Sequence, residues 1–132
     1  MKKTLWRAAT EDYIPDAASF AATREDAEAY LDNPPFGGDI LYRARIETVE
    51  RRILDLYDKR DPVTYLVRKY DEPHPGAIGV EEWIPRSPSL QESIHNDGYD
   101  WAVIRDSFPE DAETWIWLGD FEHEPELEEV AR

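Results

Sequence analysis

Apolar and polar side chains alternate most regularly between residues 40 and 47. Ile40, Tyr42, Ala44 and Ile46 occupy every second position of this segment. Because successive side chains of a strand point to opposite faces, a period of two predicts a half-buried β-strand. Shorter apolar runs predict further strands at residues 5–8, 19–22, 52–57, 101–105 and 114–118.

Three helices are predicted from start signals that precede apolar residues at helical spacing. A capping side chain, alone or before a proline, provides each signal: Thr23, Asp61-Pro62 and Ser87-Pro88. Apolar positions three and four residues apart then follow within residues 27–31, 63–70 and 90–94. We expect Asn33-Pro34-Pro35 to end the first helix. Residues 80–84 fit a strand or a helical turn equally well.

The predicted strands and helices do not alternate strictly along the chain. Such an order argues against a doubly wound parallel sheet. It predicts an α+β fold with a mixed, largely antiparallel sheet and flanking helices. No boundary is signalled before the acidic end of the chain, so we expect one domain over residues 1–121 and an acidic C-terminal tail over residues 122–132.

The chain is strongly acidic and still apolar enough to fold. Thirty acidic residues against fifteen basic ones give the 132-residue chain a net charge of −15, while 41% of its residues are hydrophobic. That apolar content supports a packed core rather than a disordered acidic segment. The charge repels phosphate backbones and anionic bilayers, so we expect neither direct nucleic-acid binding nor membrane association.

Several classes of site and segment are missing from the sequence. No apolar run reaches the roughly 18 residues of a membrane span, and no signal-peptide core follows the first lysines. The chain has no cysteine, and His74, His95 and His123 lack the spacing of a metal site. Phosphate-binding and dinucleotide-binding glycine motifs and the nucleophile elbow are also absent. We expect a cytoplasmic protein without a bound metal.

A resemblance to a known family rests on five segments in chain order. They are Leu5-Trp6-Arg7-Ala8, Ser19 to Tyr30, Leu41 to Ile46 with Ile53 to Leu56, Gly98 to Asp106, and Glu113 to Leu118. Their order and spacing resemble small bacterial and phage ADP-ribosyltransferase-fold proteins, which implies an ADP-ribosyltransferase-like fold. Two features depart from the family pattern. The Glu-x-Glu pair of many arginine-modifying transferases is absent, and Trp101 replaces a small residue.

The resemblance implies that NAD binds as a substrate, and it assigns four residues to that binding. Arg7 would contact the phosphates or a ribose of the dinucleotide, a role suited to planar, bidentate donors. Ser19 would hydrogen-bond in the nicotinamide ribose pocket, and Phe20 or Tyr30 would pack near the nicotinamide ring. The alternatives are a surface arginine at the end of an edge strand and, for both aromatic residues, ordinary core packing.

The same resemblance implies a catalytic carboxylate near the ribose, where positive charge develops as nicotinamide leaves. Asp106 is the first choice, because it directly follows the predicted strand at 101–105 and a rigid element can orient it. Glu113, at the start of the last strand, is the substitute. Glu110 and Asp111 lie further into the loop between these strands.

The function implied is that of a NAD-dependent mono-ADP-ribosyltransferase that modifies a protein target, one that is basic or binds nucleic acid. Some phage-encoded anti-CRISPR proteins of similar size share the implied fold, so a phage inhibitor of a host defence system is the nearest functional analogy. The alternative is a non-enzymatic acidic inhibitor that mimics nucleic acid and blocks a basic partner. An acidic domain whose pattern matches the family by coincidence is a third interpretation.

Overall fold

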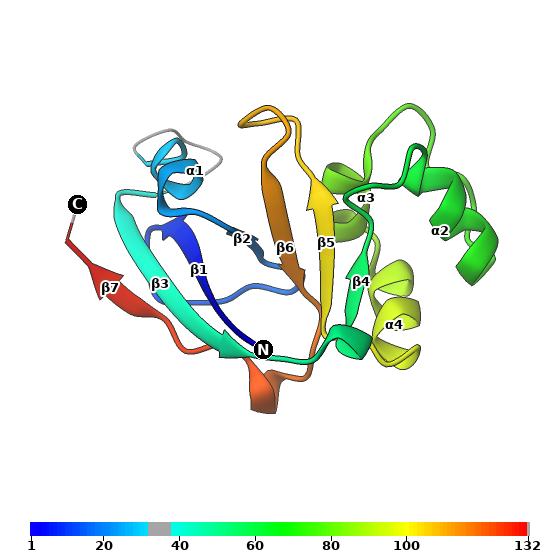
Figure 1. Cartoon of the computed structure of the whole chain (residues 1–132). Helices are drawn as coiled ribbons and strands as arrows, with labels where there is room; N and C mark the ends of the chain where they lie inside the picture. Colours follow the sequence, from blue (N-terminus) through cyan, green and yellow to red (C-terminus); the bar gives the residue numbers. More distant parts are fainter. Residues whose placement is uncertain (32–37, 132) are drawn as a thin grey trace.

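Seven strands form one mixed sheet in the order β4-β5-β6-β2-β1-β3-β7 (Figure 1). The structure is a computed structural model that describes residues 1–31 and 38–131. The strands are β1 (Lys2–Ala9), β2 (Ser19–Ala21), β3 (Ile40–Glu47), β4 (Ile53–Asp55), β5 (Trp101–Arg105), β6 (Glu113–Trp117) and β7 (Glu128–Val130). All neighbouring pairs are antiparallel except β4 and β5. The predicted α+β class with a largely antiparallel sheet is confirmed.

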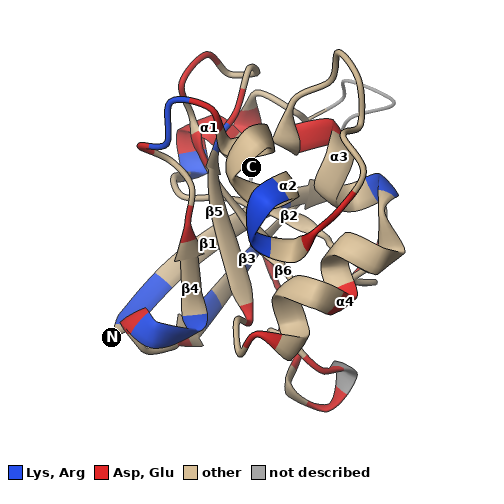
Figure 2. Cartoon of the chain, turned by 90° about the vertical axis from the view of Figure 1, so that its right-hand side faces the viewer, with Lys and Arg blue, Asp and Glu red and all other residues tan. Residues whose placement is uncertain are grey.

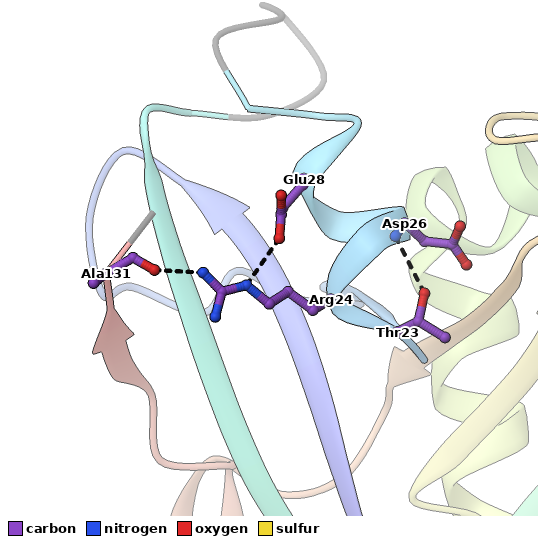
Figure 3. Close-up of polar contacts among 5 residues, drawn as sticks. All are labelled: Thr23, Arg24, Asp26, Glu28 and Ala131. Atoms are coloured by element: carbon purple, nitrogen blue, oxygen red, sulfur yellow. Dashed lines mark hydrogen bonds and ion pairs between the residues drawn. The ribbon is translucent and has the colours of Figure 1, made fainter.

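Four helices accompany the sheet within the described residues, and three begin where the sequence predicts. They are α1 (Arg24–Glu28), α2 (Pro62–Tyr70), α3 (Val80–Arg86) and α4 (Pro88–Asn96). Side chains cap three of these helices, α1, α2 and α4. Each capping side chain accepts the backbone N–H three residues further on, and the capping residues are Thr23, Asp61 and Ser87. Figure 3 shows the first of these caps, from Asp26 N to Thr23 Oγ1 over 3.1 Å. The predicted stop at residues 33–35 lies outside the described residues.

The structure shortens one predicted strand and settles one segment that the sequence left open. The strand predicted at 52–57 covers only Ile53–Asp55. Arg52 belongs to the 3-10 turn Glu50–Arg52, and after the strand the backbone N–H of Tyr57 donates to the Asp55 side chain in a turn. The ambiguous segment at residues 80–84 is helical: Val80, Trp83 and Ile84 are buried at helical spacing in α3. The three apolar residues are therefore spaced to lie on one face of a helix, and not on one face of a strand.

Both faces of the sheet are covered by apolar side chains. On one face, residues of α2, α3 and α4 pack on Ile104 and Ile116. On the other face, Leu5 and Phe20 pack with three tryptophans, Trp101, Trp115 and Trp117. Trp101 is 2% exposed, and its ring meets those of Phe20 and Trp115 edge-on at centroid distances of 5.6 and 5.7 Å. The bulky residue that departs from the family pattern is thus a core residue.

The C-terminal segment is partly tied to the sheet. Of the predicted tail at 122–132, Glu128–Val130 forms the edge strand β7, which pairs with β3. Glu128 bonds Arg43 over 2.7 Å, and this contact lowers the pKa of the Glu128 carboxyl. Figure 3 shows a second tie, from the guanidinium of Arg24 to the carbonyl of Ala131. No pattern in the sequence predicted this strand.

None of the helices in the described part of the chain has the length and apolar character required to span a bilayer.

Replacing Trp101 with alanine is expected to lower the free energy of unfolding by about 3–5 kcal/mol, because it leaves a cavity among the rings of Phe20, Trp115 and Trp117. Urea unfolding followed by circular dichroism measures the change. Val49→Ala is the control, since Val49 is 45% exposed and its loss is worth at most about 0.5 kcal/mol. Equal effects of the two substitutions would show that the tryptophan cluster does not stabilise the fold.

Candidate functional site

A cavity of about 400 Å³ lies where β1 and β2 meet α1, α3 and the loop after β5. We call it the central pocket. Five of the six residues that the resemblance singled out line it: Arg7, Ser19, Phe20, Tyr30 and Asp106. They come from β1, β2, the turn after α1 and the end of β5, and the fold brings them to one cavity.

Arg7 is a half-buried cation that has no carboxylate partner among residues 1–31 and 38–131. Its Nη1 donates to the carbonyl of Ser19 over 2.9 Å, and its guanidinium carbon lies 5.9 Å from the centre of the Phe20 ring. Its Nε is buried and has no hydrogen-bond partner in the described part of the chain. Burial lowers the pKa of Arg7. Partial burial of a guanidinium without a carboxylate partner costs free energy, and a bound anion would offset that cost.

Asp106 is held in place by three hydrogen bonds. Its Oδ1 accepts the backbone N–H groups of Ser107 and Phe108, over 2.8 and 3.3 Å. Its Oδ2 accepts the hydroxyl of Thr114 over 3.0 Å. A carboxylate offers about four acceptor positions, so these bonds fix its orientation and leave capacity for one further donor.

Tyr30 joins the turn after α1 to the loop that carries Asp106. Its hydroxyl donates to the carbonyl of Phe108, and the two rings meet edge-on with centroids 5.2 Å apart. Burial raises the pKa of Tyr30 to about 12, with smaller contributions from the charges of Asp106 and Asp26. The phenol is therefore neutral at physiological pH and acts as a hydrogen-bond donor.

The other two predicted NAD-binding residues differ in exposure. Ser19 is exposed at the start of β2, and its carbonyl is the acceptor for Arg7. Phe20 is 1% exposed and packs edge-on against Trp101. Phe20 is therefore a core residue that also borders the central pocket, and packing accounts for its burial.

Glu113 is not among the described residues that line the central pocket. Its carboxylate lies 3.6 Å from the ammonium of Lys3 and accepts the indole N–H of Trp115 over 3.1 Å. The next residue, Thr114, does line the pocket. Glu113 and Thr114 point to opposite faces of β6, and Glu113 bonds Lys3 and Trp115 instead of lining the cavity that Asp106 borders.

Sequence reasoning missed several residues of the pocket wall. Trp6 lines it from β1, and Glu81 and Glu82 line it from the first turn of α3. The two glutamates could have been placed there only if α3 had been recognised. Their carboxylates give the pocket an acidic wall, although Glu82 also lies 3.6 Å from Arg86.

The histidines and carboxylates do not form a metal centre in the part of the chain that the structure covers. His95 Nε2 lies 3.1 Å from Asp120, and His74 Nδ1 accepts the backbone N–H of Gly76 over 3.1 Å. These contacts involve one carboxylate and one backbone amide, so His74 and His95 each have a local structural partner.

Comparison with known proteins gives one structural likeness. A solved structure described as "Crystal structure of an anti-CRISPR protein" matches 98% of this chain and 96% of its own, with a TM-score of 0.54 and 14% sequence identity. At this identity the likeness shows a shared fold and says nothing of activity. No family model matches the chain, and no curated protein matches it. The ADP-ribosyltransferase resemblance stays a prediction.

The phenol of Tyr30 is expected to titrate near pH 12 instead of near its usual value of 10. Because its pKa is raised in the folded protein, its contribution to stability is complete below pH 10 and is lost as the pH rises toward about 12. The difference in phenolate absorbance between the wild type and Tyr30→Phe isolates this group. A difference that develops around pH 10 would contradict the burial of the phenol.

Proposed function

We propose that the chain is a NAD-dependent ADP-ribosyltransferase that modifies a protein target. The observation that carries the proposal is the meeting of Arg7, Ser19, Tyr30 and Asp106 in the central pocket. The resemblance singled out these residues from segments that are far apart in the sequence. A pattern that matched the family by coincidence gives no reason for them to share one cavity.

Arg7 supports an anionic ligand such as the pyrophosphate of NAD. In a chain with twice as many acidic as basic residues, this guanidinium forms no ion pair within the described ranges. The side chain of Arg7 lines the central pocket. Arginine binds phosphate through parallel N–H donors and stays charged when buried, so it can bind a phosphate oxygen without losing its proton.

Asp106 is the group we assign to the chemistry. In the transfer, the bond between the ribose and nicotinamide breaks, and the acceptor side chain bonds to the same ribose carbon. A fixed carboxylate stabilises the positive charge on the ribose and takes the proton that the acceptor loses. The three hydrogen bonds to Asp106 hold it in one orientation before a ligand arrives, which is what such stabilisation requires.

The target we propose is a basic or nucleic-acid-binding protein of a defence system. The net charge of −15 favours a basic surface as the partner and speeds the encounter with it. Acidic residues occupy α1 and the start of α3 (Figure 2). Both helices contribute residues to the wall of the central pocket. The fold shared with an anti-CRISPR protein motivates the choice of a defence system.

Labelled NAD tests the proposal directly. We expect transfer of label to a protein in a bacterial lysate, with the rate at least about a hundredfold lower for Asp106→Asn because the charge that stabilises the ribose is removed. Glu113→Gln is the matched control and should keep the wild-type rate, since Glu113 pairs with Lys3 away from the pocket. Absence of both label transfer and NAD binding in the wild type would refute the proposal.

The acidic surface favours one second candidate, an inhibitor that acts by occupying a basic, nucleic-acid-binding surface. Four glutamates near the C-terminus are exposed, namely Glu122, Glu126, Glu128 and Glu129. β7 holds Glu128 and Glu129 on the edge of the sheet. Carboxylates fixed in this way can meet a row of cations without first being ordered, which lowers the cost of binding.

Stoichiometry separates the two candidates. Under the second candidate, inhibition requires about one protein per target and weakens steeply with salt, because screening removes charge attraction. Changing Glu122, Glu126 and Glu129 together to glutamine should reduce it about tenfold or more, while Asp106→Asn should have no effect. Inhibition at a small fraction of the target concentration would exclude simple occupancy.

A further inference from the structure

Thr114 is a buried polar residue whose hydroxyl donates a hydrogen bond to Asp106. Thr114 lies in β6, is only 7% exposed and borders the central pocket. Its Oγ1 donates to Oδ2 of Asp106 over 3.0 Å. The sequence drew no attention to it, because a threonine in a predicted strand is explained by strand propensity alone.

The place of this hydroxyl is set by the sheet. Thr114 pairs with Ile104 of β5 on one side and with Ala21 of β2 on the other. A β-branched side chain has few rotamers in such a position, so the Oγ1 atom has little freedom. Asp106, in contrast, stands just beyond the end of β5, in the loop that leads to β6.

The two oxygens of Asp106 depend on different parts of the structure. Oδ1 is held by the N–H groups of Ser107 and Phe108, which belong to the same loop and move with it. Oδ2 is held by Thr114, which belongs to the sheet. The Thr114 hydroxyl thus connects the Asp106 carboxylate to the sheet, which also carries Arg7 and Ser19.

We propose that Thr114 is the positioning residue that orients the Asp106 carboxylate in the central pocket. This inference rests on the proposed transferase function, in which Asp106 acts on the ribose. The role is one of orientation: removing the hydroxyl leaves NAD binding intact and slows the transfer step. Misorientation of a reacting group by about 1 Å can cost as much as about a hundredfold in rate.

The chain offers a matched control for this contact. Thr64, in α2, donates its Oγ1 to Oδ2 of Asp61 over 2.7 Å, and this second threonine–aspartate pair is exposed. Neither residue of that pair lines the central pocket. Thr64→Val therefore removes the same type of hydrogen bond from the same protein, at a place where no effect on transfer is expected.

The test compares Thr114→Val, Thr114→Ser and Thr64→Val with the wild type in the labelled-NAD assay. We expect Thr114→Val to lower kcat by about ten- to a hundredfold with KM for NAD changed less than about twofold. Thr114→Ser, which keeps the hydroxyl, should recover most of the rate, and Thr64→Val should match the wild type. Equal rates for Thr114→Val and Thr64→Val would overturn the proposal while the transferase function stands.

A second measurement decides the matter even if the protein turns over no NAD. The amide proton signals of Ser107 and Phe108 report the hydrogen bonds to Asp106, and nuclear magnetic resonance resolves them in each variant. Thr114→Val should shift both signals, since the carboxylate rotates, whereas Thr114→Ser and Thr64→Val should leave them in place. Unshifted signals in Thr114→Val would overturn the positioning role, whatever the fate of the proposed function.

Discussion

Burial of both faces of the β5–β6 pair is the constraint on which the site depends. Trp101 and Trp115 pack on one face of the pair, and Ile104 and Ile116 face the helices on the other. A slip of one residue would exchange the two sets of side chains, so packing on both faces fixes the register. The loop from Asp106 to Ala112 therefore begins and ends at defined places, and a hydrogen bond from Asp106 N to the carbonyl of Ala112 closes it.

Local signals predicted most of the fold, and there are physical reasons why they did not predict α3 and β7. The alternation in β3 and the caps of α1, α2 and α4 are properties of a few neighbouring residues, which a sequence displays directly. The segment of α3 is too short for periodicity to separate helix from strand. The three residues of β7 form a strand only because β3 offers them an edge, and a sequence carries no local record of such a partner.

The resemblance, and no local pattern, is what grouped residues from distant segments into the candidate site, and the structure shows only that five of them line one cavity. Spacing along the chain does not reveal that β2 lies between β1 and β6, which is what brings Ser19 and Asp106 to one cavity. That Thr114 and not Glu113 borders the pocket also needed coordinates, since one position along a strand decides which face a side chain occupies. The contact between Thr114 and Asp106 joins a strand to a loop, and sequence alone could not show it.

The last strand has a consequence for how the protein behaves at high concentration. An open sheet edge is a template for pairing with another chain, and long apolar edges lead to fibrous aggregates. Here the sheet ends in a strand of only three residues, two of them glutamates. A second copy that approached this edge would bring its own glutamates against them. Repulsion between like charges thus works against edge-to-edge pairing at β7.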